Sequence, residues 1–227
     1  MEPFTIVDEQ QDFIIINKAA NVSFHDEGNE LGLHNLVKQH VKLAHLYPVH
    51  RLDKITSGLL IFAKNKLTAQ RFQQRFERKE ITKFYLAISD KKPKKKQGLI
   101  AGDMEKSRRG MWKLTRSMHN PAKSQFFSYS LTPQSRLFLI KPLTGKTHQI
   151  RVALSSIGSP ILGDNYYAKS TADRGYLHAF GLSFTLNEQQ YKYQVQPNSG
   201  AHFLTTGCLT AINAIRDPWQ LPWPKKY

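Results

Sequence analysis

The alternation of apolar and polar residues along the chain predicts a series of short strands. Each expected strand is a run rich in apolar, β-branched or aromatic residues, bounded by polar or turn-forming residues. Such runs lie at 13–17, 58–63, 81–89, 124–131, 135–141, 176–186 and 191–196. Turn residues at 132–134 and 187–188 are typical of hairpins, so the last four strands are expected to form two antiparallel pairs.

Apolar residues at helical spacing predict four helices. These helices are expected at 31–45, 66–79, 147–157 and 203–216. Asn65 is a suitable N-cap for the second helix and Thr147 for the third, and Gly158 is expected to end the third. Hairpin-like strands with interspersed helices are typical of an α+β fold with a mixed, mostly antiparallel sheet and flanking helices. Because no internal repeat or linker is evident, we expect a single domain over 1–227.

A basic stretch at about 91–123 interrupts the apolar pattern. It begins with KKPKKKQG, in which five lysines surround a proline, and this composition predicts an exposed loop or hairpin tip. The lysines are Lys91, Lys92, Lys94, Lys95 and Lys96. A second basic group consists of Lys106, Arg108, Arg109, Lys113 and Arg116. We therefore predict a poorly patterned basic insertion, anchored by the apolar side chains of Met111 and Trp112.

The composition indicates a globular protein with a polyanionic partner. Hydrophobic residues make up 40% of the chain and charged residues 22%, as in folded rather than disordered proteins. The 227 residues include 33 Lys and Arg against 17 Asp and Glu, a formal net charge of +16. This excess favours nucleic acid first and an anionic membrane second. No strongly amphipathic basic helix is evident, which argues against the membrane.

Several classes of protein and site are disfavoured. A single Cys excludes a disulfide framework and a Cys-based metal site, and no two histidines have the spacing of a zinc helix. The polar, acidic start lacks signal-peptide features and no apolar run could span a bilayer, so we expect a cytoplasmic protein. The segment TGKT at 144–147 suggests a phosphate-binding loop, but Ile140 stands where that motif requires glycine.

The segment at 50–64, HRLDKITSGLLIFAK, is the most informative part of the sequence. It places Asp53 between Arg51 and Lys54, immediately before a buried strand. Flanking cations favour an ionised carboxylate, which is a usable nucleophile. A structural Arg–Asp turn pair is the alternative, and the residues alone favour it. No second carboxylate lies nearby in sequence, so a two-carboxylate glycosidase is not indicated.

This segment closely resembles the catalytic motif of the RluA-type family of pseudouridine synthases. Four more segments resemble blocks of that family: IINKAANVSFH at 15–25, KFYLA at 83–87, LTGKTHQIRVALSSIGSPILGD at 143–164 and YLHAFGLSF at 176–184. The resemblance spans roughly 12–186, and the longer blocks make chance similarity remote.

The sequence also departs from the family pattern. Ala19 and Asn21 stand where the opening block usually has Pro and Gly, Lys146 replaces an Arg, and Ala153 replaces a His. Lys146 keeps a charge that can bind phosphate but loses the bidentate geometry of Arg. Many relatives carry an N-terminal S4 RNA-binding domain. The stretch before the first expected strand has too few residues to form such a domain, so none is expected here.

The resemblance assigns roles to individual residues. Asp53 would be the nucleophile, acting on C1′ or as the base that begins elimination through a glycal. Arg151 would pair with this catalytic Asp. Tyr85 would stack on uracil and help remove the C5 proton, and Leu177 would pack against the base. Arg51 would fill the gap left by the extruded nucleotide.

The resemblance thus implies isomerisation of uridine to pseudouridine in structured RNA. Such a reaction involves no redox step or net hydrolysis, so no cofactor or metal is expected. A stem-loop in rRNA or tRNA is the expected substrate, because a loop base costs least to extrude. Lys146, Lys94, Lys95 and Lys96 are expected to contact RNA phosphates, and no obligate protein partner is evident. Two alternatives remain: a catalytically silent RNA-binding module and a DNA- or membrane-surface binder.

Overall fold

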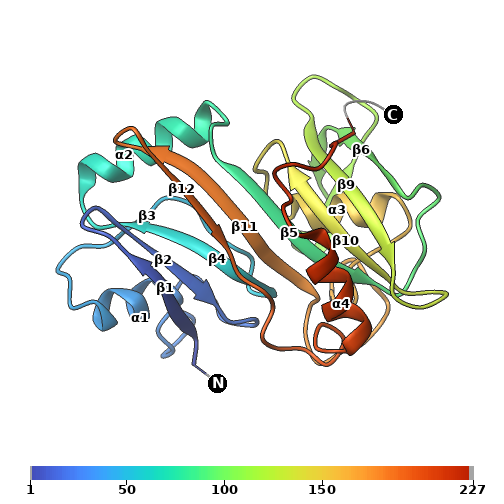
Figure 1. Cartoon of the computed structure of the whole chain (residues 1–227), viewed down its shortest axis with the longest axis horizontal. Helices are drawn as coiled ribbons and strands as arrows, with labels where there is room; N and C mark the ends of the chain where they lie inside the picture. Colours follow the sequence, from blue (N-terminus) through green and yellow to red (C-terminus); the bar gives the residue numbers. More distant parts are fainter. Residues whose placement is uncertain (1, 225–227) are drawn as a thin grey trace. The chain divides into compact units, whose positions relative to one another are not determined.

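The computed structural model describes residues 2–224, which form two compact units (Figure 1). The first unit extends to Thr82 and includes Ala179–Gln196. The second unit consists of Lys83–His178 and the chain from Pro197 onward. Each unit is thus built from two separate segments of the sequence, so neither is a simple half of the chain.

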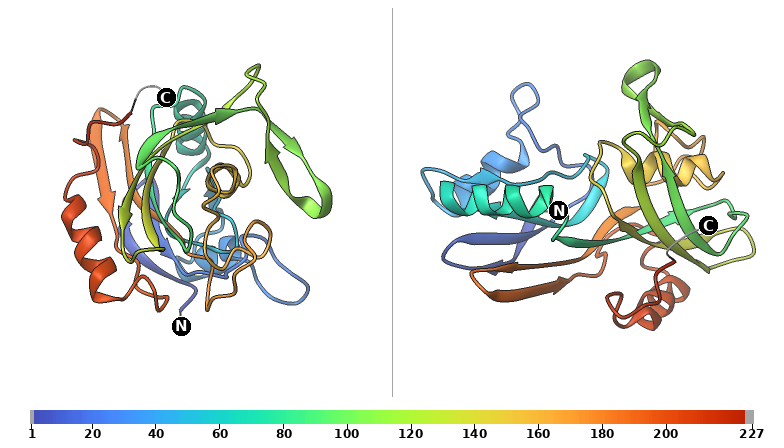
Figure 2. Two further views of the ribbon diagram at one scale, coloured as in Figure 1. Left: turned by 90° about the vertical axis from the view of Figure 1, so that its right-hand side faces the viewer. Right: turned by 90° about the horizontal axis from the view of Figure 1, so that it is seen from above.

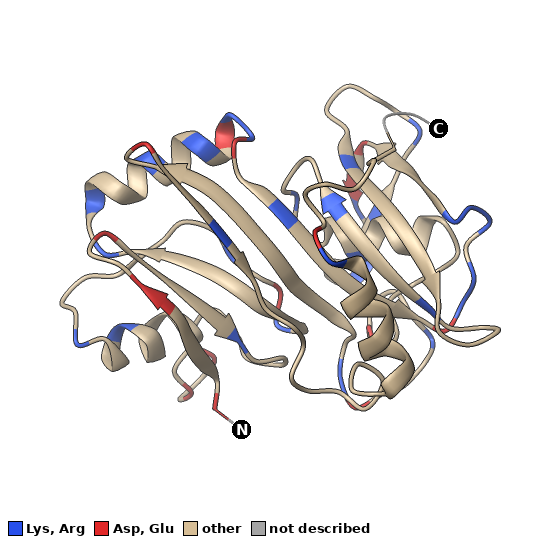
Figure 3. Cartoon of the chain, in the orientation of Figure 1, with Lys and Arg blue, Asp and Glu red and all other residues tan. Residues whose placement is uncertain are grey.

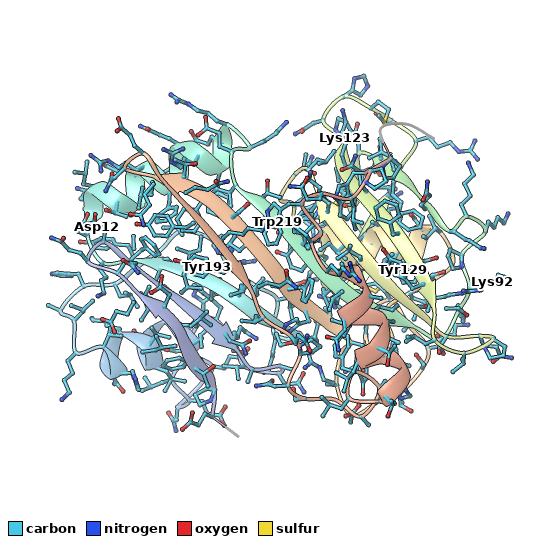
Figure 4. The ribbon with its side chains drawn as sticks, viewed as in Figure 1. Asp12, Lys92, Lys123, Tyr129, Tyr193 and Trp219 are labelled. Carbon is cyan, nitrogen blue, oxygen red and sulfur yellow. The ribbon has the colours of Figure 1, made fainter. Side chains whose placement is uncertain are left out.

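The first unit is built on strands in the order β1-β2-β4-β11, with β3 paired to β4 and β12 paired to β11. The pairs β1–β2, β2–β4, β3–β4 and β11–β12 are antiparallel. The strands are β1 (Phe4–Glu9), β2 (Phe13–Lys18), β3 (Tyr47–Pro48), β4 (Thr56–Ala63), β11 (Leu177–Leu186) and β12 (Gln189–Gln194). The Tyr193 hydroxyl of β12 donates to Asp8 Oδ2 of β1 at 2.5 Å, and Figure 4 labels this tyrosine.

Two helices complete this unit: α1 (Leu33–His40) and α2 (Lys66–Glu77). The second begins where predicted, because Asn65 Oδ1 accepts from Thr68 N at 2.8 Å. Phe72 of α2 is fully buried, with its ring centroid 6.0 Å from that of Phe13 and 5.0 Å from that of Phe184. These edge-to-face aromatic contacts fix α2 against the sheet.

A glycine at position 58 allows β4 to approach β11 closely. Its φ is +108°, and a Cβ there would lie 2.3 Å from Ala179 O and 2.6 Å from Ala179 N. Both the backbone angle and the contact therefore require glycine. This close approach fixes the beginning of β4, and with it the loop that precedes the strand.

The second unit contains an antiparallel sheet in the order β5-β10-β9-β6. Its strands are β5 (Thr82–Ser89), β6 (Gln97–Gly102), β9 (Ala122–Ser130) and β10 (Arg136–Pro142). A separate hairpin of β7 (Met104–Lys106) and β8 (Trp112–Leu114) is closed by a 3-10 turn, η1 (Arg108–Gly110). This hairpin, green in Figure 2, extends away from the other strands of the unit.

Helices and aromatic side chains cover the second unit. The helices are α3 (Gln149–Ser156) and α4 (Thr206–Ile215). Trp219, labelled in Figure 4, and Trp223 lie with ring centroids 4.9 and 5.4 Å from that of Phe84 on β5. Gln125 of β9 donates to Pro224 O at 2.7 Å. The end of the described chain therefore packs against the sheet of this unit.

The predicted α+β class with mostly antiparallel pairing is confirmed. The seven expected strands and four expected helices are all present, with shifted ends. Five strands, β1, β3, β6, β7 and β8, were not expected, and the stretch 91–123 is more regular than predicted. The expected cap at Thr147 is wrong, because His148 is the N-cap residue of α3. None of the helices in residues 2–224 is long and apolar enough to cross a membrane.

We predict that Gly58→Ala lowers the free energy of unfolding by about 1–3 kcal/mol, because the added Cβ must displace backbone atoms of Ala179. Denaturant titration measures this change. Gly207→Ala is the matched control: nothing lies within 4 Å of a Cβ at this position in α4, so stability should rise by about 0.4–1 kcal/mol. A Gly58→Ala protein as stable as wild type would contradict the close approach.

Candidate active site

The loop between β3 and β4 carries two of the predicted site residues, Arg51 and Asp53, in the first unit. Arg51 is exposed and Asp53 is half-buried, while Leu52 between them is only 5% exposed and anchors the loop in the core. The backbone turns back on itself here, because Thr56 N donates to Asp53 O at 2.9 Å. The carboxylate therefore lies on a short, ordered turn rather than on a long mobile loop.

Lys18 is a buried cation that fixes this loop. It is 1% exposed, and its Nζ donates to Ala19 O at 2.9 Å, Lys54 O at 3.1 Å and Thr56 O at 2.8 Å. A buried ammonium is stable only when carbonyl or carboxylate oxygens replace its water. Lys18 therefore joins the end of β2 to Lys54 and Thr56, which directly follow Asp53 in the turn. The sequence analysis assigned it no role, although it lies in the matched segment 15–25.

Arg151 lies on α3 in the second unit and forms a bidentate ion pair with Asp164. Its Nε and Nη2 donate to Asp164 Oδ2 and Oδ1 at 2.7 and 2.8 Å. The two side chains are 6% and 0% exposed. Two tyrosine rings, those of Tyr166 and Tyr167, have centroids 5.2 Å from the Arg151 Cζ. The guanidinium is thus held by charge, by paired hydrogen bonds and by cation–π contacts.

The loop 144–147 before α3 is held by Gln149. Its Oε1 accepts from the Thr144 hydroxyl at 2.7 Å and from Lys146 N at 3.0 Å. Its Nε2 donates to Lys123 O and Ser124 Oγ of β9, both at 3.0 Å. Lys146 is half-buried and donates to Asn120 O. This loop is therefore a turn organised by a buried amide.

Tyr85 and Leu177 are the two predicted site residues that lie in strands. Tyr85 is on β5, opposite Ile140 of β10, and is 9% exposed. Leu177 is the first residue of β11 and is 3% exposed. Its carbonyl accepts from Nη2 of the buried Arg174 at 3.2 Å. Both side chains are therefore buried.

The lysines of the loop between β5 and β6 are exposed, as predicted. This loop is marked blue in Figure 3, and Figure 4 labels Lys92. Its end is ordered, because Ser128 N of β9 donates to Lys96 O at 2.7 Å. Lys94, Lys95 and Lys96 thus form part of a fixed positive surface. Within residues 2–224, no group of three or more His, Cys, Asp or Glu side chains could hold a metal ion.

Comparison with known proteins decides the family. The model of the RNA pseudouridylate synthase family matches residues 12–156. This chain belongs to that family. A Haemophilus influenzae protein named "Uncharacterized RNA pseudouridine synthase" is 49% identical over 201 residues, which cover 88% of this chain and 90% of that protein. The predicted family is therefore confirmed.

Two further pseudouridine synthases show how far the likeness extends. "Ribosomal large subunit pseudouridine synthase C" of Rickettsia bellii is 41% identical over 123 residues, which cover 52% of this chain and 41% of that protein. The structure of human RNA pseudouridylate synthase domain containing 1 covers 99% of this chain and 100% of its own, with a TM-score of 0.76 and 24% identity. The latter likeness shows a common fold.

Lys83 begins the KFYLA segment of this pseudouridine synthase and has an altered ionisation. Burial lowers its pKa to about 8, from an ordinary value of 10.5. The site that a Cβ on Gly145 would occupy lies 3.7 Å from Lys83 Nζ, so the loop 144–147 lies against this ammonium. The charged form is therefore disfavoured in the folded state.

We predict that Lys83 makes stability increase with pH above about 8. Between the folded pKa of about 8 and the ordinary value of 10.5, the unfolded chain binds more protons than the folded chain, so the free energy of unfolding must rise with pH. Lys83→Met should lose this increase, whereas Lys66→Met, at an exposed position, should keep it. Denaturant titrations across this window compare the three proteins. Parallel profiles for wild type and Lys83→Met would show that burial does not perturb this lysine.

Proposed function

We propose that this chain converts uridine to pseudouridine in RNA, with Asp53 as its nucleophile. The observation that carries the proposal is the family match over 12–156, which includes HRLD at 50–53. The geometry of the loop supports it, because Lys18 fixes the backbone that directly follows a half-buried carboxylate. A carboxylate held in one place can be presented to a substrate with little loss of entropy.

The proposed chemistry rearranges one bond of the substrate. The Asp53 carboxylate attacks C1′, or acts as the base that begins elimination through a glycal, and the N-glycosidic bond breaks. The uracil then turns, C5 joins C1′, and the proton on C5 leaves as a proton becomes bound at N1. Atoms and electrons balance within the nucleotide, so the reaction needs neither an oxidant nor a hydrolytic water.

The remaining site residues have separate proposed roles. Tyr85 is proposed to stack on uracil and to assist removal of the C5 proton. Leu177 is proposed to pack against the base, which suits its apolar, buried position. Arg151 is proposed to pair with the catalytic carboxylate. Arg51, exposed beside Asp53, is proposed to occupy the gap left in the RNA by the flipped nucleotide.

The proposed substrate is a stem-loop of rRNA or tRNA. The name of the Rickettsia bellii relative refers to the large ribosomal subunit, which favours rRNA, although the chain spans only 41% of that protein. The exposed lysines of the loop between β5 and β6 are proposed to bind phosphates rather than bases. Action in the cytoplasm remains a prediction. A silent RNA-binding module and a DNA binder are the alternatives that the following experiments separate.

We predict that Asp53→Asn abolishes pseudouridine formation while the protein stays folded and binds RNA within a few-fold of wild type. Asn has nearly the same shape as Asp but is a poor nucleophile. Nucleoside analysis of the RNA and thermal unfolding are measured on the same preparation. Asp90→Asn, at an exposed position, is the control for the chemical change.

A purely structural Asp53 would give the reverse result. Thermal stability would then fall, and whatever fraction stayed folded would remain active. A stable Asp53→Asn protein that still converts uridine at a measurable rate would refute the nucleophile. A wild-type protein that binds RNA but never forms pseudouridine would favour the silent module.

The lysine cluster should determine part of the salt dependence of RNA binding. We predict that replacing Lys91, Lys92, Lys94, Lys95 and Lys96 with Ser weakens binding. Each lost phosphate contact should reduce the slope of log affinity against log salt by about 0.7–0.9, because each contact releases condensed counterions. Binding titrations at several salt concentrations measure the slope, and parallel titrations with DNA of the same length test the DNA alternative. An unchanged slope would identify the cluster as ordinary solvated surface.

A further inference from the structure

The hairpin β7–β8, residues 104–114, is an exposed basic arm in the second unit; we call it the arm (Figure 2). Its exposed cations are Lys106, Arg108, Arg109 and Lys113. Lys106 Nζ lies 6.0 Å from the Trp112 ring centroid, and Lys113 pairs with Glu105 at 3.2 Å. These contacts hold the strands of the arm together while leaving its 3-10 turn, with two arginines, open to a polyanion.

The base of the arm is firmly fixed by Asp103. Its carboxylate accepts from Ser117 Oγ at 2.6 Å, from His119 N at 3.0 Å and from Asn120 N at 2.8 Å. These hydrogen bonds lower the pKa of Asp103. Its backbone N–H donates to Ser117 O and its carbonyl accepts from Thr115 N, each at 2.8 Å. A displacement of the arm therefore also displaces the residues bonded to Asp103, because its base is not a flexible hinge.

Tyr167 connects the arm to the surroundings of Arg151. The backbone N–H of Trp112 donates to the Tyr167 hydroxyl at 2.8 Å. The same hydroxyl lies 3.0 Å from Nδ1 of His148, the N-cap residue of α3. The ring of this tyrosine, as described above, has its centroid 5.2 Å from the Arg151 Cζ. One side chain thus touches the arm, the start of α3 and the guanidinium.

The turn that carries Tyr167 also carries the anionic partner of Arg151. Asp164 N donates to Ile161 O at 3.1 Å, Ala168 N donates to Asp164 O at 2.9 Å, and Tyr166 N donates to Asp164 Oδ1 at 3.0 Å. A displacement of this turn must therefore move both the carboxylate and the tyrosine rings around Arg151. The orientation of the guanidinium is set by a turn to which the arm is directly hydrogen bonded.

We propose that Tyr167 is a positioning residue through which RNA held by the arm fixes the orientation of the Arg151 guanidinium. The inference rests on the proposed function, because it gives Arg151 a part in pseudouridine formation and the arm a part in RNA binding. It accounts for a tyrosine hydroxyl bonded to the backbone of a hairpin that otherwise projects from its unit. Catalysis would then depend on RNA being seated on the arm as well as on extrusion of the target base.

The test is a double-mutant cycle between the Tyr167 hydroxyl and the cations of the arm. Tyr167→Phe removes the hydrogen bond to Trp112 N but keeps the ring beside Arg151. Replacement of Arg108 and Arg109 by Ser weakens the seating of RNA on the arm. Single-turnover rates of pseudouridine formation at saturating enzyme, and RNA affinities, are measured for wild type, both variants and their combination.

We expect Tyr167→Phe to lower the single-turnover rate on the order of tenfold, with RNA affinity within about twofold of wild type. The arm variant should lose both affinity and rate. The combined variant should react no more slowly than Tyr167→Phe alone, because the connection is already broken. Tyr166→Phe is the matched control for coupling, because the Tyr166 ring also faces Arg151. The factor by which this variant lowers the single-turnover rate should multiply with the factor for the arm variant.

Rate losses for Tyr167→Phe and the arm variant that simply multiply would overturn the inference, since a merely structural tyrosine acts independently of the arm. If Tyr167→Phe fails to fold, Trp112→Pro removes the same hydrogen bond from the other side. Met111 has φ −78° and ψ 168°, which suits a residue before proline. A wild-type protein that forms no pseudouridine would refute the proposed function, and an active wild type with independent effects would refute this inference alone.

Discussion

The buried ion pair between Arg151 and Asp164 is the interaction on which the second unit's candidate site depends. An Asp that is 0% exposed is stable only if its charge is matched, and the bidentate guanidinium of Arg151 supplies that match. Loss of either partner would leave an uncompensated buried charge. The pair therefore fixes α3 against the turn that bears two tyrosines, and through Tyr167 it is connected to Trp112, beside the 3-10 turn of the arm.

The first unit also contains a buried charge that holds a site segment in place, the ammonium of Lys18. Its ammonium is buried and bonded to three carbonyl oxygens, so it orders backbone and has no exposed surface to offer a substrate. The half-buried carboxylate of Asp53 lies on the turn that it orders. In each unit, a fully buried charge thus holds in place the segment that bears a proposed catalytic residue. Such an arrangement holds the backbone of each of these segments in place before substrate binds.

Periodicity identified the strands and helices that carry an apolar face, and local chemistry identified the Asn65 cap. It missed β1, in which polar residues alternate irregularly around a register shift, and β6, whose Gly and Gln residues form a strand only by pairing with β9. Helix α1 ends before the predicted 45, because Lys42 adopts a left-handed conformation. The partnership of Arg151 with Asp164 links residues 13 positions apart across a turn, a separation that no periodic pattern marks. The motif resemblance located Asp53 but gave no reason for Lys18, whose partners are backbone carbonyls and so leave no trace in side-chain chemistry.

Release of tritium from RNA labelled at C5 of uridine tests the central claim most directly. Purified protein is incubated with labelled rRNA and tRNA stem-loops, and solvent tritium and chain integrity are followed together. The account predicts tritium released in step with pseudouridine formed, in RNA whose backbone stays intact. Retention of all the label by RNA that the protein demonstrably binds would contradict it.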